Sequence, residues 1–289
     1  MSQQLSTLQR APVLRHTRLL MTLKFDFTGH SALVTAGTGG IGGAIAEALS
    51  HSGANVVIHG RTQEPAVDEI LAKCRSGGTR ASFVAADLFQ MTQKTVDDVF
   101  NTAIAAEPNI DLLVNNAGGC AYYGPFVDVT FEQYHRMLNF NYTFGYFLTQ
   151  RFVRHWLKNK TRGRVVMTGS INGSLAEPGS SLYDSLKAGV GMLVKSLASE
   201  LAGQGIRING FAPGMVITPY TNWLRDRKDD AAWIRLHTPN GQLPEPDSCV
   251  GAALFLLSDA AEHVHGHMLF VDGGMSAWQQ PGRPANFKV

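Results

Sequence analysis

Seven short apolar runs recur along the chain, and their alternation with helical segments constrains the fold more than any other feature. Each run is rich in Val, Ile, Leu or Ala, as a buried strand requires, and stretches with helical periodicity separate most of them. The apolar runs cover 31–35, 55–61, 82–87, 111–118, 164–170, 206–214 and 268–274, and the helical candidates lie near 41–52, 63–77, 92–106, 131–158, 183–203 and 247–258. This order predicts a single doubly wound α/β domain, in which helices cover both faces of a seven-stranded parallel sheet.

The first apolar run leads directly into a glycine-rich turn. The sequence AGTGGIGG (36–43) follows Ser31–Thr35, and a stretch with helical periodicity begins at Ala44. Glycines allow the backbone to approach a pyrophosphate closely, and the helix N-terminus offers it free N–H groups and a positive dipole. A glycine triplet is often only a turn, but its place between a strand and a helix predicts a dinucleotide site.

The end of the second apolar run indicates which dinucleotide is bound. An acidic residue at this point suits the ribose of NAD, whereas a basic residue suits the 2′-phosphate of NADP. The run ends in His59-Gly60-Arg61 and carries no carboxylate at its tip. We therefore expect NADP(H) in preference to NAD(H), with His59 and Arg61 as contacts; the alternative for Arg61 is a solvated surface arginine.

A hydroxyl, a phenol and an amine are the candidate catalytic groups. Ser170 ends the fifth apolar run, and Tyr183 and Lys187 are four residues apart at the start of a predicted helix, so they share one helix face. A free tyrosine has a pKa of about 10, and a nearby ammonium group should lower it towards the working pH. Such a pair also occurs by chance in many helices. With Ser170 it suggests a proton-transfer site for an alcohol or a carbonyl.

Composition excludes several other classes of protein. The net charge of +2 gives no reason to expect nucleic acid as a partner. The three cysteines are scattered without metal-ligand spacing, so neither a disulfide framework nor a metal site is expected, and a reducing compartment such as the cytoplasm fits best. No apolar run reaches the roughly 18 residues of a membrane span.

The two ends of the chain differ from the centre. Residues 1–24 contain Arg and Lys but no acidic residue, unlike the sequence that follows them. This segment is interpreted as a disordered arm, an over-extended start with Met21 as the initiator, or an organelle targeting peptide. Residues 276–289 are either an arm that packs on a neighbouring subunit or a frayed tail.

Together these motifs resemble the short-chain dehydrogenase/reductase family, in its single-domain branch. The resemblance extends from about Phe25 to Gly274 and rests on several motifs in the family's order. These are TAGTGGIG (35–42), NNAG (115–118), Asn141, Ser170 with Tyr183 thirteen residues later, Lys187, Pro213-Gly214 with Ile217 and Thr218, and VDGG (271–274). It implies a Rossmann-type domain over 25–275 that includes a substrate lid at 215–245.

The resemblance also implies roles for individual residues. Tyr183 exchanges the proton, Ser170 holds the substrate oxygen, Lys187 binds the nicotinamide ribose, and Asn141 supports a water that passes protons to Lys187. The implied cofactor contacts are Gly37, Thr38, Gly39, Gly40, Ile41, Gly42, His59, Arg61, Asp87, Leu88, Asn115, Ala117, Gly118, Tyr183, Lys187, Pro213, Gly214, Ile217 and Thr218.

Two positions depart from the family pattern, and two of the assigned residues have simpler explanations. Ala36 replaces the first glycine of the loop; a small residue should be tolerated there, with a slight change in the shape of the loop. Gln242 stands where arginine is frequent. Without the resemblance, Asn141 would be a buried helix amide bonded to backbone, and Asp87 would cap the next helix.

Substrate choice should depend on three loops over the strand ends, at 119–130, 171–182 and 215–245. Their mixed aromatic and polar residues suit a sugar or polyol, a cyclic or xenobiotic ketone, or a 3-oxoacyl thioester. The alternative to an enzyme is a non-catalytic nucleotide-binding protein on the same fold. The helices near 131–158 and 183–203 resemble those that pair subunits in the family, which implies a homodimer or homotetramer.

Overall fold

A single seven-stranded parallel sheet forms the centre of the protein, and the computed structural model describes residues 25–277. The strand order is β3-β2-β1-β4-β5-β6-β7. The strands are β1 (Ser31–Val34), β2 (Asn55–Gly60), β3 (Ala81–Ala85), β4 (Leu112–Asn115), β5 (Arg164–Thr168), β6 (Arg207–Pro213) and β7 (Met268–Val271). The predicted doubly wound fold is confirmed. The predictions for 1–24 and for the end of the tail lie outside the described residues.

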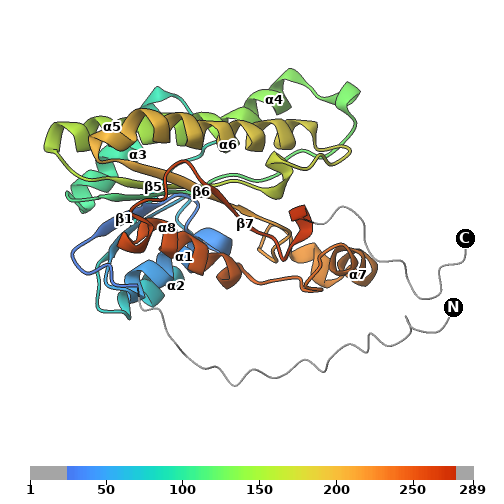
Figure 1. Ribbon diagram of the computed structural model, residues 1–289, viewed down its shortest axis with the longest axis horizontal. Coiled ribbons are helices and arrows are strands. Elements are labelled where there is room, and N and C mark those ends of the chain that lie inside the picture. The colour runs from blue at the N-terminus through green and yellow to red at the C-terminus, as the bar shows by residue number, and fades with distance from the viewer. Residues whose placement is uncertain (1–24, 278–289) are drawn as a thin grey trace, which may run out of the picture.

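Helices cover both faces of the sheet, as Figure 1 shows. One layer contains α1 (Gly40–His51), α2 (Pro65–Arg75) and α8 (Val250–Leu257). The other contains α3 (Gln93–Ala106), α5 (Phe144–Asn159) and α6 (Ser181–Leu201), with α4 (Phe131–Leu138) beyond them. The remaining helix, α7 (Lys228–Leu236), lies at the edge of the domain.

Each sheet face has its own apolar core, because successive side chains of a strand point to opposite faces. In β1, Ala32 and Val34 pack in the core beneath α1, α2 and α8, whereas Leu33 packs in the core beneath α3, α5 and α6. All four residues of β1 are buried. A strand buried on both faces reads as a continuous apolar run, and this explains why the sequence revealed it so clearly.

The chain order reverses between β1 and β4, which are neighbours in the sheet. The crossover from β1 runs to one side through β2 and β3, and the chain then returns to continue through β5, β6 and β7 on the other side. Connections on opposite sides of one point leave a crevice beyond the carboxyl ends of the strands. The sheet thereby provides the position for a ligand site.

The long helix predicted over 131–158 is interrupted. Between α4 and α5 the chain forms a π-helical turn, Asn139–Thr143. The side-chain amide of Asn141 donates a hydrogen bond to the backbone oxygen of Met137, four residues earlier, at 3.1 Å. A side chain that inserts into the i→i−4 ladder is a known cause of such a distortion. The turn buries Asn141 beside the carboxyl end of β4.

The predicted lid contains a short 3-10 helix, Asn222–Arg225, as well as α7. Its apolar residues Ile217, Leu224 and Ile234 form a small core of their own, separate from the two cores of the sheet. None of the helices within residues 25–277 is both long enough and apolar enough to cross a membrane.

Candidate active site

The glycine-rich turn has no room for side chains where it meets the sheet. A Cβ atom on Gly37 would lie 2.9 Å from Cγ2 of Ile58 and 3.0 Å from the backbone oxygen of Val34. A Cβ atom on Gly42 would lie 2.3 Å from the backbone oxygen of Ala36. The turn therefore fits tightly against β1 and β2, and it leads into α1, whose first N–H groups have no partner within the helix. This arrangement suits a pyrophosphate.

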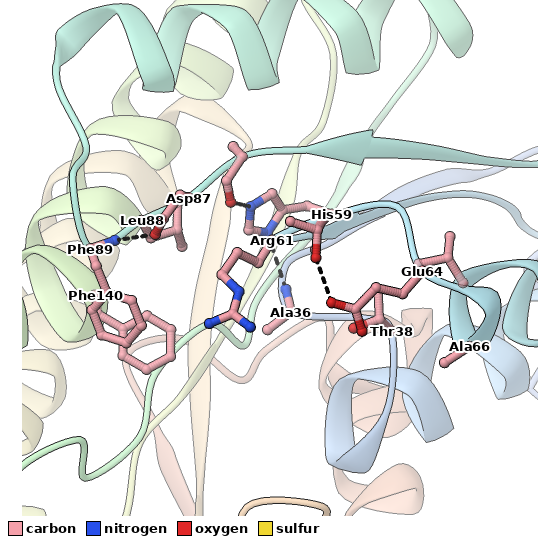
Figure 2. A pocket seen from close by; sticks show the side chains of 14 residues that line it. Ala36, Thr38, His59, Arg61, Glu64, Ala66, Asp87, Leu88, Phe89 and Phe140 are labelled. Carbon is pink, nitrogen blue, oxygen red and sulfur yellow. Dashed lines mark hydrogen bonds between the residues drawn. The ribbon is translucent and has the colours of Figure 1, made fainter.

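A cavity of about 280 Å³ lies beside this turn, beyond the ends of β1, β2 and β3. Figure 2 shows the Arg61 side chain extending into it between the aromatic wall and Thr38. Phe89 and Phe140 form the aromatic wall, with ring centroids 4.9 Å apart. A space bounded by aromatic rings and an exposed guanidinium suits a nucleoside that carries a phosphate. The residues predicted from the sequence that line the cavity are Thr38, His59, Arg61, Asp87 and Leu88.

His59 lines this cavity but offers it no free polar atom. Its ring is 2% exposed, and both ring nitrogens are bonded to backbone atoms, of Ala36 and of Ala86. Both ring nitrogens are thus occupied, and the cofactor contact predicted for His59 stays a prediction that other atoms of the residue would have to make. Asp87, in turn, caps no helix: its carboxylate accepts a hydrogen bond from the Phe89 N–H at 2.9 Å.

Two successive asparagines, at the last position of β4 and just beyond it, face opposite sides of the sheet. Asn115 points towards α5, where its amide donates to Thr149 Oγ1 at 2.7 Å and to the Gly145 oxygen at 3.4 Å. Its side chain is thus directed away from the predicted contact with the cofactor ribose. Asn116, which follows it, is directed towards the glycine-rich turn.

Asn116 connects three strand ends. Its Nδ2 donates to the backbone oxygens of Thr35 at 3.2 Å and Ala36 at 3.3 Å, and its Oδ1 accepts from the Thr168 hydroxyl at 3.1 Å. The Thr35 hydroxyl accepts from the N–H groups of Asn116 and Ala117, each at 2.9 Å. These bonds tie the turn after β1 to the ends of β4 and β5. Spacing alone did not indicate the contributions of Thr35 and Thr168.

Tyr183, Lys187 and Ser170 converge at the carboxyl end of β5. Tyr183 and Lys187 lie one turn apart near the start of α6, and the Lys187 ammonium is 5.6 Å from the centre of the tyrosine ring. Lys187 Nζ donates to the backbone oxygen of Thr168 at 2.9 Å. The Ser170 hydroxyl lies close enough to the Tyr183 phenol to lower its pKa. The predicted proton-transfer groups therefore lie together in the structure.

The protonation of this group differs from the expectation drawn from the spacing. Burial raises the pKa of Tyr183 to about 12, and the neighbouring Ser170 hydroxyl offsets this only in part. Burial also lowers the pKa of Lys187 to about 8. The Tyr183 pKa therefore moves above its ordinary value, opposite to the predicted direction, because desolvation disfavours the phenolate more than its polar neighbours favour it. At neutral pH the phenol carries its proton and can act as an acid.

Asn141 lies beside Lys187 in the site, and both side chains face Gly118. Its amide donates to the Gly119 oxygen at 3.0 Å and to the Met137 oxygen, and its Oδ1 accepts from the Gly119 N–H at 2.9 Å. A Cβ atom on Gly118 would lie 2.9 Å from both Asn141 Oδ1 and Lys187 Nζ. Both amide hydrogens are thus bonded to backbone. The predicted water contact of Asn141 therefore has to come from another of its atoms.

A polar network missed by the sequence interpretation fixes the loop that follows Ser170. The Asn172 N–H donates to Ser170 Oγ at 3.1 Å, and the Asn172 amide donates to Asp184 Oδ1 at 2.8 Å and to Glu177 Oε2 at 3.1 Å. Asp184 follows Tyr183 directly and also accepts from the Glu177 N–H at 2.8 Å. A carboxylate next to Tyr183, together with an amide two residues after Ser170, was the only signal available in the sequence.

The lid contacts both the glycine-rich turn and the loop after β4. A Cβ atom on Gly40 would lie 3.4 Å from Cβ of Thr218, so Thr218 covers the start of α1. The Tyr220 hydroxyl donates to the backbone oxygen of Cys120. Ile217 is buried in the core of the lid, so its side chain is not available for the predicted cofactor contact.

The remaining predicted contacts lie around the same crevice. Pro213 ends β6, and Gly214, which follows it, packs against Asp272, since a Cβ atom on this glycine would lie 3.1 Å from the Asp272 Cα. Strands β1 to β6 all carry a predicted residue at or just beyond their carboxyl ends. The crevice therefore combines a nucleotide-sized cavity, a glycine cradle and a proton-transfer group.

Comparisons with known proteins agree with this geometry. A family profile described as enoyl-(acyl carrier protein) reductase matches residues 35–276. The chain is 34% identical over 254 residues to 3beta-hydroxysteroid dehydrogenase 1 of Eggerthella lenta, which covers 88% of this chain and 96% of that protein.

Solved structures are similar over the same region. A gluconate 5-dehydrogenase from Burkholderia cenocepacia, in complex with NADP and tartrate, superposes with a TM-score of 0.81 at 30% identity, covering 89% of this chain and 98% of that one. A 3-oxoacyl (acyl-carrier-protein) reductase from Agrobacterium tumefaciens with NADP bound gives a TM-score of 0.80 at 29% identity, covering 90% and 99%.

Proposed function

The chain belongs to the short-chain dehydrogenase/reductase family, and on this premise we propose that it is an NADP(H)-dependent oxidoreductase that interconverts a secondary alcohol and a ketone. The observation that carries the proposal is the convergence of Ser170, Tyr183 and Lys187 at the edge of the crevice that begins with the glycine-rich turn. A non-catalytic nucleotide-binding protein would have no need of this proton-transfer group.

NADP(H) is the cofactor that the residues of the crevice fit best. The glycine cradle and the first N–H groups of α1 would hold the pyrophosphate, and the cavity beside Asp87 and Leu88 would hold the adenosine. Arg61 would pair with the 2′-phosphate, since a guanidinium matches phosphate geometry. The Burkholderia and Agrobacterium relatives hold NADP, which supports the same choice here.

The chain's own residues supply the proton and orient the substrate. When bound, a nicotinamide supplies or accepts the hydride. In reduction, Tyr183 gives its proton to the substrate oxygen as the carbonyl becomes an alcohol, and in oxidation it takes the proton back. Ser170 holds the same oxygen against the phenol. The Lys187 cation, held by the Thr168 oxygen, favours the phenolate that remains after proton transfer.

The entrance to the crevice favours a neutral or moderately polar substrate. Tyr123 and Tyr220 are 63% and 57% exposed there. Partial burial raises the pKa of the Tyr123 phenol, and the nearby Glu177 and Asp184 raise it further. This supports a sugar, a polyol or a cyclic ketone. A 3-oxoacyl thioester stays as the second candidate, because of the similarity to the Agrobacterium reductase.

We also propose that the protein is a cytoplasmic homodimer or homotetramer, with residues 25–275 as the catalytic domain and 215–245 as its substrate lid. Helices α5 and α6 lie side by side on one face of the sheet (Figure 1). Their outer surface carries exposed apolar residues, among them Tyr146 and Met192, which suit a subunit interface. The three cysteines are unpaired, as is usual in a reducing compartment.

The test is an absorbance assay of NADPH oxidation and NADP⁺ reduction across ketones, sugars, polyols and a 3-oxoacyl thioester, with NAD(H) in parallel. We expect turnover with at least one alcohol or ketone, and Tyr183→Phe should lower kcat by roughly 10²- to 10⁴-fold while NADPH binding persists. Undiminished turnover in Tyr183→Phe would refute the mechanism. A preference for NAD(H) would refute the assignment of Arg61.

A further inference from the structure

The first residue of the glycine-rich turn, Ala36, has a backbone conformation that favours glycine. Its φ is 49°, and among residues 25–277 only Lys160 shares a positive φ without being a glycine. In this left-handed region the Cβ atom crowds the following carbonyl oxygen, a penalty that glycine avoids. Ala36 therefore needs contacts that hold it in place.

His59 provides such a contact from the end of β2. The Ala36 N–H donates to His59 Nδ1 at 3.2 Å, and His59 Nε2 is 3.2 Å from the backbone oxygen of Ala86 (Figure 2). The Gly37 N–H donates to the backbone oxygen of His59 at 2.9 Å. Because an amide N–H can only donate and a carbonyl can only accept, the ring must carry its proton on Nε2.

The surroundings of His59 keep its ring neutral. The side chain is 2% exposed, and the Phe144 ring of α5 packs against it with centroids 5.4 Å apart. Burial lowers the pKa of His59 to about 4. Arg61 and Asp87 line the same cavity, from the ends of β2 and β3. At physiological pH, Nδ1 is therefore free of a proton and can accept the Ala36 N–H.

The opposite side of the Ala36 peptide is also held. Asn116 Nδ2, beyond the end of β4, donates to the Ala36 oxygen at 3.3 Å. The two polar backbone groups of Ala36 are thus bonded by side chains that come from opposite sides of β1. Together they fix the direction in which the turn enters α1 and the shape of the cavity wall that Ala36 and His59 share.

We infer that His59 is a positioning residue for cofactor binding: its Nδ1 holds Ala36 in the left-handed conformation and so sets the turn that receives the pyrophosphate. The inference rests on the proposed function, because the property that His59 is inferred to affect is the affinity for NADP(H). It also accounts for the departure from glycine at position 36, since the histidine stabilises the left-handed backbone conformation that alanine disfavours.

Two matched variants test the two hydrogen bonds of the His59 ring separately. His59→Asn keeps an acceptor near the position of Nδ1, whereas His59→Gln reaches the Ala86 oxygen but leaves the Ala36 N–H without its partner. By fluorescence titration, we expect the NADPH dissociation constant of His59→Asn to stay within about threefold of wild type and that of His59→Gln to rise about tenfold. The kcat at saturating cofactor should change by less than about threefold in both, since neither touches the proton-transfer group.

The variant Ala36→Gly tests whether His59 acts through Ala36. Glycine adopts a positive φ without strain, so in the Ala36→Gly background the change His59→Gln should weaken NADPH binding by less than about threefold. An equal loss in both backgrounds would overturn the inference, as would a folded His59→Gln protein that binds NADPH as tightly as wild type. Thermal melting shows which variants are folded.

One measurement needs no substitution. Histidine-selective ¹⁵N labelling of the wild-type protein at neutral pH should show His59 as the neutral tautomer protonated at Nε2. Protonation at Nδ1 would overturn the inference even if every variant unfolds, because Nδ1 could not then accept the Ala36 N–H. Failure of the wild-type protein to bind NADPH, with the tautomer as expected, would instead refute the proposed function.

Discussion

Replacing Gly42 by alanine should damage the glycine-rich turn, although the same replacement at Gly43 should be harmless. Both glycines are buried in the first turn of α1. A Cβ atom on Gly42 would lie 2.3 Å from the Ala36 oxygen and 2.5 Å from Asn116 Nδ2, which are bonded to each other. A Cβ atom on Gly43 would meet its nearest neighbour, the Gly37 oxygen, at 3.5 Å, an ordinary contact.

The magnitude follows from these contacts. A methyl group on Gly42 would have to displace Asn116 Nδ2, whose two hydrogen bonds contribute about 0.5–1.5 kcal/mol each to the free energy of unfolding. Overpacking adds about 1–3 kcal/mol, so the total loss is roughly 2–6 kcal/mol. For Gly43→Ala, the better helix propensity of alanine contributes up to about 1 kcal/mol in the favourable direction.

Thermal unfolding and NADPH titration measure both effects. We expect Tm to fall by roughly 5–20 °C in Gly42→Ala and to stay within about 3 °C of wild type in Gly43→Ala. NADPH affinity should fall at least tenfold in Gly42→Ala, because the turn that receives the pyrophosphate moves. If the two variants melt within about 2 °C of each other and bind NADPH equally, the packing argument for this turn is wrong.

Three further predictions concern a charge, a proton and a hydrogen bond. Arg61→Ala should raise the KM for NADP(H) by roughly 10- to 100-fold and leave that for NAD(H) nearly unchanged, because only the 2′-phosphate pairs with the guanidinium; equal effects on both cofactors in steady-state assays would contradict this. The hydrogen bond from His30 to Asp111, at 2.5 Å, raises the pKa of His30. The contribution of this bond to stability is therefore complete below about pH 6.5 and is lost as the pH rises through the raised pKa of His30 in the folded protein. The Tm difference between wild type and His30→Gln should shrink with rising pH, and a constant difference would contradict the assignment. Asn172→Ala should lower kcat about 2- to 10-fold, with the KM for NADP(H) unchanged, because the Ser170 hydroxyl loses its side-chain acceptor, Asn172 Oδ1 at 3.5 Å, and the loop loses the amide bonds to Asp184 and Glu177. The bond from the backbone N–H of position 172 to Ser170 Oγ is kept in the variant, and an unchanged kcat would show that this bond is enough to hold Ser170.

Local periodicity explains how much of the fold could be read from the sequence. Strands buried on both faces appear as apolar runs, and all seven were found within a few residues of their true ends. The pairing of Tyr183 with Lys187 on one helix face depends only on helix geometry, so it too was visible. The family motifs then indicated which strand ends carry polar residues, and those ends share one crevice.

Other features depended on residues far apart in the sequence. Helical periodicity over 131–158 gave no sign of the π turn, because the bond from Asn141 to Met137 forms where the amide also meets Gly119, 22 residues away. The alternation of side chains along β4 implied that Asn115 and Asn116 point to opposite faces. Only the packing of α5 decided which of the two reaches the turn.

The sequence by itself determined the doubly wound sheet, the glycine-rich turn and the placing of Tyr183 and Lys187 on one helix face, because these follow from backbone geometry and short spacings. Only the tertiary structure decided how His59 is used and which way the pKa of Tyr183 moves. Both depend on desolvation and on hydrogen bonds between strand ends, such as that from Ala36 to His59 across 23 residues of sequence. These quantities belong to the folded environment of a side chain, and a linear pattern does not contain them.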